Sequence, residues 1–165
     1  MKDNYSECLN IGQSWENALQ ACAEKLPFNI SRNDASDPSA LDFFLQTTFD
    51  LKVRLTPFLL SHSFVGIPAE YAVPVNENKL IRYFKTETGM ILFYVDYRQR
   101  FPTHGLFIIS IKKAKKLYNE NPQRIHKYKD RTDDTKNARA SFYIDLRECE
   151  MLPLKLFNLM KGALK

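Results

Sequence analysis

The sequence predicts an α/β protein in which a central mixed β-sheet is flanked by helices. Residues 90–97 and 106–111 are nearly continuous apolar runs, which is the pattern of strands buried on both faces. In other stretches apolar residues recur at helical spacing. The predicted helices and strands alternate along the chain, and this order suits a mixed sheet with helices packed on its faces.

The first part of the chain is expected to contain a helix and a β-hairpin. Ser14 is placed to cap a helix that runs to about Leu26, where Pro27 ends it. Residues 41–54 form two short apolar runs joined by a polar turn, so they predict a hairpin. Residues 55–75 contain three prolines and predict an irregular excursion that ends in a short strand at 72–75.

A second helix and the two buried strands follow. Asn76 or Glu77 is expected to begin a helix that runs to about Thr88, with Gly89 at the C′ position. Its predicted apolar face consists of Leu80, Ile81 and Phe84.

The last part of the chain is expected to be partly irregular. Residues 112–120 predict a short helix, and 121–139 are polar and rich in turn-forming residues. A strand is predicted at 141–146. Pro153 suits the first turn of a terminal helix. The residues of that helix expected to face inward are Leu156, Phe157, Met160 and Leu164.

Composition restricts the possible classes of protein. The 165 residues are most simply one domain, 1–165, and the net charge of +5 permits an anionic partner. The three cysteines are isolated and show no zinc-ligand spacing, which favours reduced thiols and a cytoplasmic location. The N-terminal sequence lacks the features of a signal peptide, and no apolar run reaches membrane-spanning length. We therefore expect no membrane association.

The predicted hairpin carries a group of charges that suits metal-assisted chemistry. Asp50 and Lys52 project from the same face of a strand because side chains alternate along it. Pairing of the two runs would bring Asp42 alongside them. Two carboxylates are hard oxygen ligands for a divalent cation, and a nearby amine stabilises developing negative charge. This combination is suited to attack on a phosphodiester.

The order of these residues resembles that of the PD-(D/E)xK, or restriction-endonuclease-like, nuclease superfamily. Glu16 corresponds to the acidic residue of the first helix, Asp42 to the first Asp of the motif, and Asp50-Leu51-Lys52 to (D/E)xK. Leu41 stands where the family often has Pro. The resemblance covers a core of about residues 14–111, and a basic loop, strand and helix at 112–165 would be an addition to it.

The resemblance implies a magnesium-dependent DNA endonuclease with catalytic residues Glu16, Asp42, Asp50 and Lys52. Asp42, Asp50 and the Leu51 carbonyl would bind Mg²⁺, and Lys52 would orient the attacking water or stabilise negative charge. The substrate would be double-stranded DNA. Since cutting both strands requires two active sites, a homodimer or higher oligomer is expected. We favour a sequence-specific enzyme of the restriction or homing type over a resolvase or repair nuclease.

Basic residues in the second half of the chain are candidates for contacts with DNA phosphates, which position DNA without reading its sequence. They are Arg98, Arg100, Lys112, Lys113, Lys115, Lys116, Arg124, Lys127, Lys129 and Arg131.

Other interpretations of these charges remain open. Asp50 and Lys52 would also suit the solvated face of an edge strand, and Asp42 would suit a loop cap. Glu16 would favour the start of a helix through the helix dipole. Asp96 and Asp145 each close an apolar strand, as does the nearby Glu148, and they are interpreted as strand-end caps. A non-catalytic nucleic-acid-binding protein is the alternative function.

Overall fold

Two β-sheets form the framework of the protein. The computed structural model describes residues 13, 14, 17, 31–32, 43–44, 48–86, 88–128 and 140–163. Sheet A contains, in spatial order, β1 (Ser31–Arg32), β2 (Phe43–Phe44), β3 (Thr48–Arg54), β5 (Met90–Asp96), β6 (His104–Ser110) and β9 (Glu150–Met151). Strands β3 and β5 are parallel and the other neighbours are antiparallel, so sheet A is mixed.

Sheet B is a smaller antiparallel sheet with β4 (Ala72–Asn76), β8 (Ala140–Asp145) and β7 (Ile125–Lys127) in that order. The strand predicted at 141–146 is present as β8, but the sequence did not predict a second sheet. Alternation of apolar residues identifies a strand but does not determine which strand it pairs with. The short strand β7 was not predicted.

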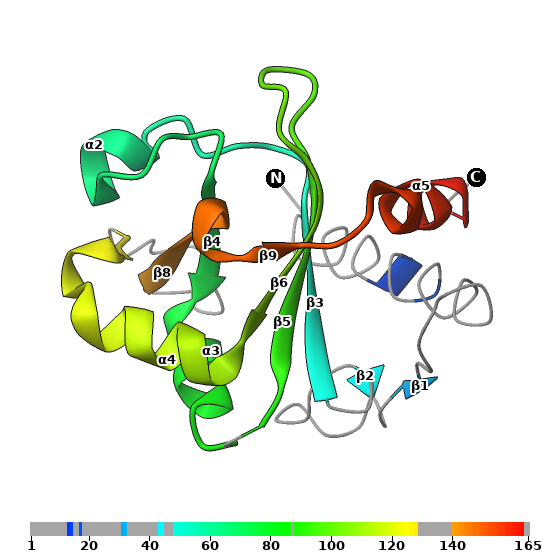
Figure 1. Ribbon diagram of the computed structural model, residues 1–165. Helices are drawn as coiled ribbons and strands as arrows, with labels where there is room; N and C mark the ends of the chain where they lie inside the picture. Colours follow the sequence, from blue (N-terminus) through cyan, green and yellow to red (C-terminus); the bar gives the residue numbers. More distant parts are fainter. Residues whose placement is uncertain are drawn as a thin grey trace, which may run out of the picture.

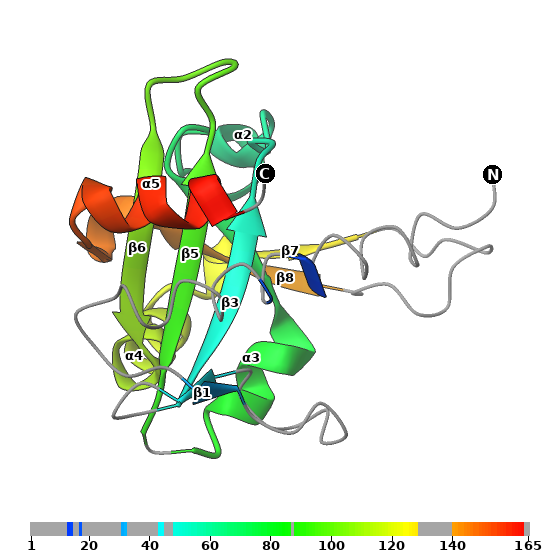
Figure 2. The same cartoon turned by 90° about the vertical axis from the view of Figure 1, so that its right-hand side faces the viewer.

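The helices lie on both faces of sheet A, which confirms the predicted fold class (Figure 1). Helix α5 (Leu154–Ala163) packs on one face, where it crosses β6, β5 and β3 (Figure 2). Sheet B, α3 (Glu77–Tyr83) and α4 (Ile111–Glu120) lie on the other side. The short helix α2 (Ser61–Val65) belongs to the excursion that follows β3. Among the described residues, no helix has the length and apolar character needed to span a membrane.

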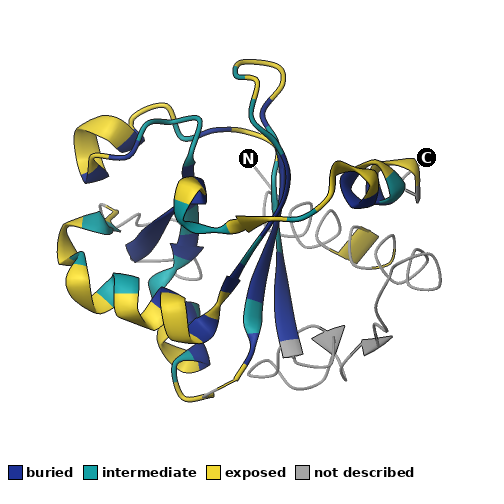
Figure 3. Cartoon of the chain, in the orientation of Figure 1, coloured by how far each residue is buried: buried dark blue, intermediate teal, exposed yellow. Residues whose placement is uncertain are grey.

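Each face of sheet A is packed against its own hydrophobic cluster, so the strands are buried from both sides (Figure 3). On the α5 side, Phe49 of β3 and Tyr94 of β5 pack against Phe157 and Met160. On the opposite side, residues of β5 and β6 pack against α3, α4 and sheet B in the larger cluster. This second cluster contains no residue of β3.

Local sequence signals explain where α3 and α4 begin. The Asn76 side chain accepts a hydrogen bond from the Lys79 N–H at 3.2 Å, and the Ser110 side chain accepts one from the Lys113 N–H at 3.1 Å. Both are N-caps, which satisfy an amide that has no partner inside the helix. The predicted starts of both helices were therefore correct to within a residue.

The predicted end of α3 was wrong. The helix stops at Tyr83, so Gly89 (φ 131°) is not at its C′ position but immediately precedes β5. Ile81, predicted to face the core, is exposed, whereas Tyr83 is buried. Tyr83 lies three residues after Leu80 and shares its face of the helix.

The hairpin of β2 and β3 confirms the prediction for residues 41–54: Phe43 is opposite Phe49, and Phe44 is opposite Thr48. In the predicted first helix, Gln13, Ser14 and Asn17 are helical, so Ser14 lies inside the helix and not at its cap. The rest of that helix and Leu164 are outside the described residues. Leu156, Phe157 and Met160 of α5 are buried, as predicted.

Replacing Phe157 with Ala is expected to lower the free energy of unfolding by about 3–5 kcal/mol, because it leaves a cavity in a fully buried site. The Phe157 ring stacks on Tyr94, with ring centres 4.6 Å apart. Leu154→Ala, at an exposed position of the same helix, is the matched control and should change stability by no more than about 0.5 kcal/mol. Urea unfolding measures both, and similar losses in the two variants would contradict this packing.

Candidate active site

Strand β3 has one apolar face and one charged face. Phe49 and Leu51 face α5. Asp50, Lys52 and Arg54 alternate with them and stand beside Ile91, Phe93 and Val95 of β5, whose side chains belong to the larger cluster. The charged face of β3 is therefore directed into the protein, toward α3 and β4.

The carboxylate of Asp50 lies at one end of this charged face and is fully buried. The Lys52 ammonium forms an ion pair with its Oδ2 atom. The Lys79 Nζ, from α3, is 3.2 Å from its Oδ1 atom. The lysine side chains are 15% and 29% exposed, so both amines approach Asp50 from the direction of solvent.

This environment excludes the interpretation of Asp50 and Lys52 as a solvated edge. Strand β3 is an internal strand, with β2 on one side and β5 on the other. Moving a carboxylate from water into a protein interior costs several kcal/mol, and nearby cations with hydrogen bonds are needed to offset it. Replacement of a buried ion pair by apolar residues of similar volume is often neutral or stabilising, so stability alone does not account for these charges.

Lys79 was not anticipated from the sequence. It is 29 residues from Asp50 and reaches it only because the chain returns through β4 and α3. The Asn76 cap fixes the first turn of α3, and Lys79 is in that turn. The helix start was predictable, but no spacing in the sequence connects its third residue with β3.

Arg54 continues the charged face at the far end of β3. Its Nη2 donates a hydrogen bond of 2.5 Å to the Pro74 carbonyl in β4, and its Nη1 donates one of 3.1 Å to the Val53 carbonyl. Burial lowers the pKa of Arg54, which Tyr97 and Asp50 partly oppose. The guanidinium thus connects the end of β3, in sheet A, with β4 in sheet B.

The described residues do not by themselves complete a magnesium site. Within the described ranges there is no group of three His, Cys, Asp or Glu side chains placed to hold a metal ion. Asp50 is one hard oxygen ligand, and among the described residues Lys52 and Lys79 form ion pairs with it. The predicted residues Glu16 and Asp42 lie outside the described residues, and Leu51 is described only as a buried side chain between Asp50 and Lys52.

The predicted DNA-binding residues do not form one surface. Arg98 and Arg100 follow β5, whereas Lys112, Lys113, Lys115 and Lys116 follow β6 on α4. Since β5 and β6 are antiparallel, these two groups are at opposite ends of sheet A. The second group is nearer Asp50, which pairs with Ile91 near the start of β5.

Several of these basic side chains already have partners inside the protein. The Arg124 guanidinium forms an ion pair with both oxygens of Glu148, at 2.6 and 3.1 Å. The Lys113 amine donates to the Glu148 carbonyl. Lys112, Lys115 and Lys127 are exposed. Lys129 and Arg131 are outside the described residues.

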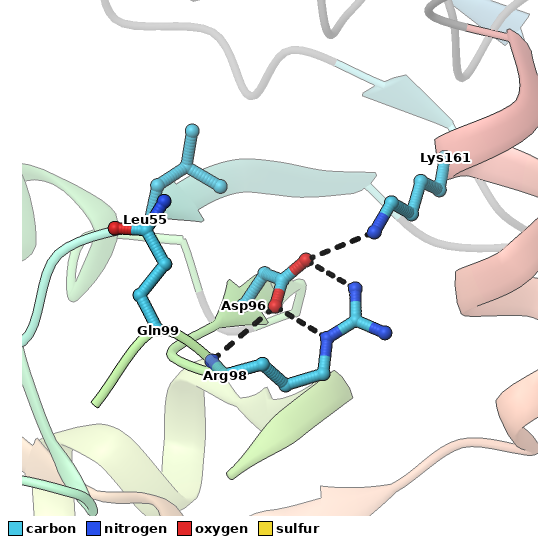
Figure 4. A pocket seen from close by; sticks show the side chains of 5 residues that line it. All are labelled: Leu55, Asp96, Arg98, Gln99 and Lys161. Atoms are coloured by element: carbon cyan, nitrogen blue, oxygen red, sulfur yellow. Dashed lines mark hydrogen bonds and ion pairs between the residues drawn. The ribbon is translucent and has the colours of Figure 1, made fainter. Parts of the chain in front are cut away.

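Asp96 lines a separate open pocket of about 540 Å³ at the ends of β3 and β5, with Leu55, Arg98, Gln99 and Lys161 (Figure 4). The Arg98 side chain donates to both Asp96 oxygens, at 2.7 and 2.5 Å, and the Lys161 amine is 3.5 Å away. The Asp145 carboxylate similarly accepts from the Arg147 backbone and side chain. Both carboxylates are therefore strand-end caps, as predicted.

The Asp96 cap should contribute stability that depends on pH. The hydrogen bonds from Arg98 lower the pKa of Asp96 from 3.8 to about 2. A lowered pKa in the folded state means that stability is gained above pH 3.8 and lost as the pH falls through about 2. We expect Asp96→Asn to cost at most about 2 kcal/mol at neutral pH and progressively less below pH 4. Urea unfolding at several pH values measures this difference, and a cost that does not change with pH would contradict it.

No family model and no curated protein matches this chain. Among solved structures, the chain is similar to D212, described as a nuclease from a fusselovirus. The TM-score is 0.44 and the sequence identity 14%, over 99% of this chain and 96% of that chain. The arrangement of Asp50, Lys52 and Lys79, and not this similarity, is the basis of the functional argument that follows.

Proposed function

We propose that the protein is a metal-dependent nuclease that hydrolyses phosphodiester bonds in DNA, with Asp50 and Lys52 in its active site. The observation that carries this proposal is the fully buried Asp50, paired with Lys52 from its own strand and with Lys79 from α3. An acid and a lysine two residues apart, on a hairpin strand parallel to a central strand, match the arrangement that the PD-(D/E)xK resemblance implies.

The two lysines suit the charge changes of phosphodiester hydrolysis. The scissile phosphate gains negative charge in the transition state, and fixed positive groups nearby stabilise that charge more than they stabilise the ground state. The Lys52 and Lys79 side chains are partly exposed, and their amines lie beside a buried carboxylate. A phosphate from solvent can therefore approach both lysines, and their ion pairs with Asp50 hold the two amines in position.

We propose Mg²⁺ as the cofactor, with Asp50 and Asp42 as its protein carboxylates. Asp42 is the second carboxylate of the motif that the PD-(D/E)xK resemblance implies, and it lies outside the described residues. Magnesium typically uses one or two protein carboxylates and keeps several waters. The ion would supply an activated water and neutralise charge. The Leu51 carbonyl is the further proposed ligand, and Glu16 would bind a metal-bound water or a second ion.

We also propose that the enzyme cuts double-stranded DNA as a homodimer, since cutting both strands requires two active sites. The exposed lysines of α4 are the best placed of the basic residues to hold the flanking phosphates, because they are at the same end of sheet A as Asp50. Cleavage at a specific sequence, as in restriction or homing enzymes, is the form of this activity that we favour over resolvase or repair activity.

The decisive experiment is cleavage of supercoiled plasmid with and without Mg²⁺. We expect metal-dependent nicking or linearisation that falls about 100-fold or more in Asp50→Asn and in Lys52→Met, since each change removes a group that acts on the developing charge. Lys155→Met is the matched control, because it removes an exposed lysine of α5, on the opposite face of sheet A, and should leave the rate unchanged. Circular dichroism checks that the variants are folded.

One observation favours a second function, nucleic-acid binding without cleavage. The cations Lys52, Lys79 and Arg54 outnumber the single described carboxylate on this face. If binding of DNA weakens steeply with salt while no divalent metal supports cleavage of single- or double-stranded DNA, the nuclease proposal is wrong and the binding function is correct. Cleavage that survives both Asp50→Asn and Lys52→Met would show that the active site lies elsewhere.

A further inference from the structure

Five aromatic rings form a continuous series at the end of β3 that carries Arg54. The rings are Phe58, Phe64, His126, Tyr128 and Tyr143, which we call the aromatic ladder. Phe64 stacks on His126 with ring centres 4.4 Å apart, and His126 meets Tyr128 edge to face at 4.9 Å. Phe58 lies between Phe64 at 5.9 Å and Tyr143 at 5.5 Å.

The outer part of the ladder is open to solvent. Phe64 is 48% exposed and Tyr128 is 38% exposed, and they are the exposed Phe and Tyr side chains in the part of the chain that the structure describes. Leu59 and Leu60, which precede α2 directly, are also exposed. Exposed apolar side chains that are grouped together mark interaction sites more often than single ones do, so this surface is a candidate binding site.

Arg54 places a positive charge beneath the ladder. Tyr128 and Tyr143 lie close enough to Arg54 to influence its titration, and their hydroxyl groups are 3.3 Å apart. No carboxylate among the described residues forms an ion pair with Arg54, and its buried Nε–H has no acceptor there. A buried cation without a paired anion costs free energy, and its field extends far in a poorly polarisable interior.

The ladder is connected to Asp50 by the charged face of β3. Asp50, Lys52 and Arg54 lie on that face at every second position. With a rise of about 3.3 Å per residue, Arg54 is roughly 13 Å from Asp50 along the strand. The charged face of β3 thus leads from Asp50, with its two lysines, to Arg54, and the exposed rings lie at the Arg54 end.

We propose that the aromatic ladder binds a single-stranded segment of nucleic acid, whose bases stack on Phe64 and Tyr128 while Arg54 attracts its phosphates. Sites for single strands combine rings, on which any base can stack, with positive charge that follows the backbone. The inference rests on the proposed function in that the bound strand would lead toward Asp50. Its central claim, strand binding at the ladder, requires no cleavage.

A second copy of the protein is a poorer occupant of this surface. In a two-fold symmetric dimer the same patch faces itself, so the positive charge of Arg54 would be brought into the interface twice. Association of like charges in a desolvated interface is unfavourable. A polyanion removes this difficulty, because its phosphates supply the missing negative charge.

Fluorescence anisotropy with a labelled single-stranded oligothymidylate, in EDTA to prevent cleavage, tests the proposal. Loss of one stacking contact corresponds to about tenfold weaker binding, and we expect this for Phe64→Ala and for Tyr128→Ala. Tyr128→Phe, which keeps the ring, should bind like the unaltered protein. Arg54→Met should weaken binding and reduce its dependence on salt. Ile81→Ala and Leu154→Ala, which remove exposed apolar side chains elsewhere, are matched controls with unchanged affinity.

The possible outcomes separate this inference from the proposed function. Unchanged oligothymidylate binding in folded Phe64→Ala and Tyr128→Ala would overturn the ladder as a binding site. If Phe64→Ala instead alters only the oligomeric state in sedimentation, the surface is a contact between copies and the inference is wrong. Asp50→Asn should retain oligothymidylate binding, so failure of the nuclease proposal would show in the cleavage assay alone.

Discussion

The buried ion pairs of Asp50 are the interaction on which the site depends. A carboxylate with no exposure is ionised inside a protein only when positive groups surround it, and here two lysines meet it from different elements. Packing of Phe49 and Leu51 against α5 orients β3, so that Asp50 and Lys52 are turned toward α3. Lys79 reaches Asp50 from the first turn of α3, which the Asn76 cap begins.

The chain between β3 and β5 carries Lys79 and also supplies Phe58 and Phe64 to the aromatic ladder. It leaves β3 through α2, returns along β4 in sheet B, and begins α3 at Asn76 before joining β5. The Arg54 guanidinium donates a hydrogen bond to the Pro74 carbonyl of β4 and so links this segment to sheet A. The segment between β3 and β5 therefore places Lys79 at one end of the charged face of β3 and the exposed Phe64 at the other end.

The elements that depend on local sequence were predictable. Two nearly continuous apolar runs identified β5 and β6, and Asn76 or Glu77 was predicted to begin α3. The start of α4 was predicted to within a residue, although its Ser110 cap was not. The hairpin followed from apolar patterning, although its turn has no Gly or Asn. The end of α3 was missed because Gly89 was interpreted as its C′ residue, whereas its conformation belongs to the entry into β5.

Features that depend on distant contacts were not predictable. Asp50 and Lys52 were found because they share a strand face, but Lys79 and the Arg54 environment arise from the packing of sheet B and α3 against sheet A. The division of the strands between sheets A and B also depends on contacts between distant parts of the chain. Periodicity specifies which side of a strand is buried, whereas the partner strand is selected by the whole chain.

The central claim is that the buried charges of β3 are retained for function and not for stability. The most direct measurement is the free energy of unfolding and the cleavage rate of one double variant, Asp50→Leu with Lys52→Met. Lys79, which is 29% exposed, can then turn toward water. The account predicts a protein within about 1 kcal/mol of the original stability, or more stable, that has lost metal-dependent cleavage. A folded double variant that cleaves DNA at the original rate would contradict it.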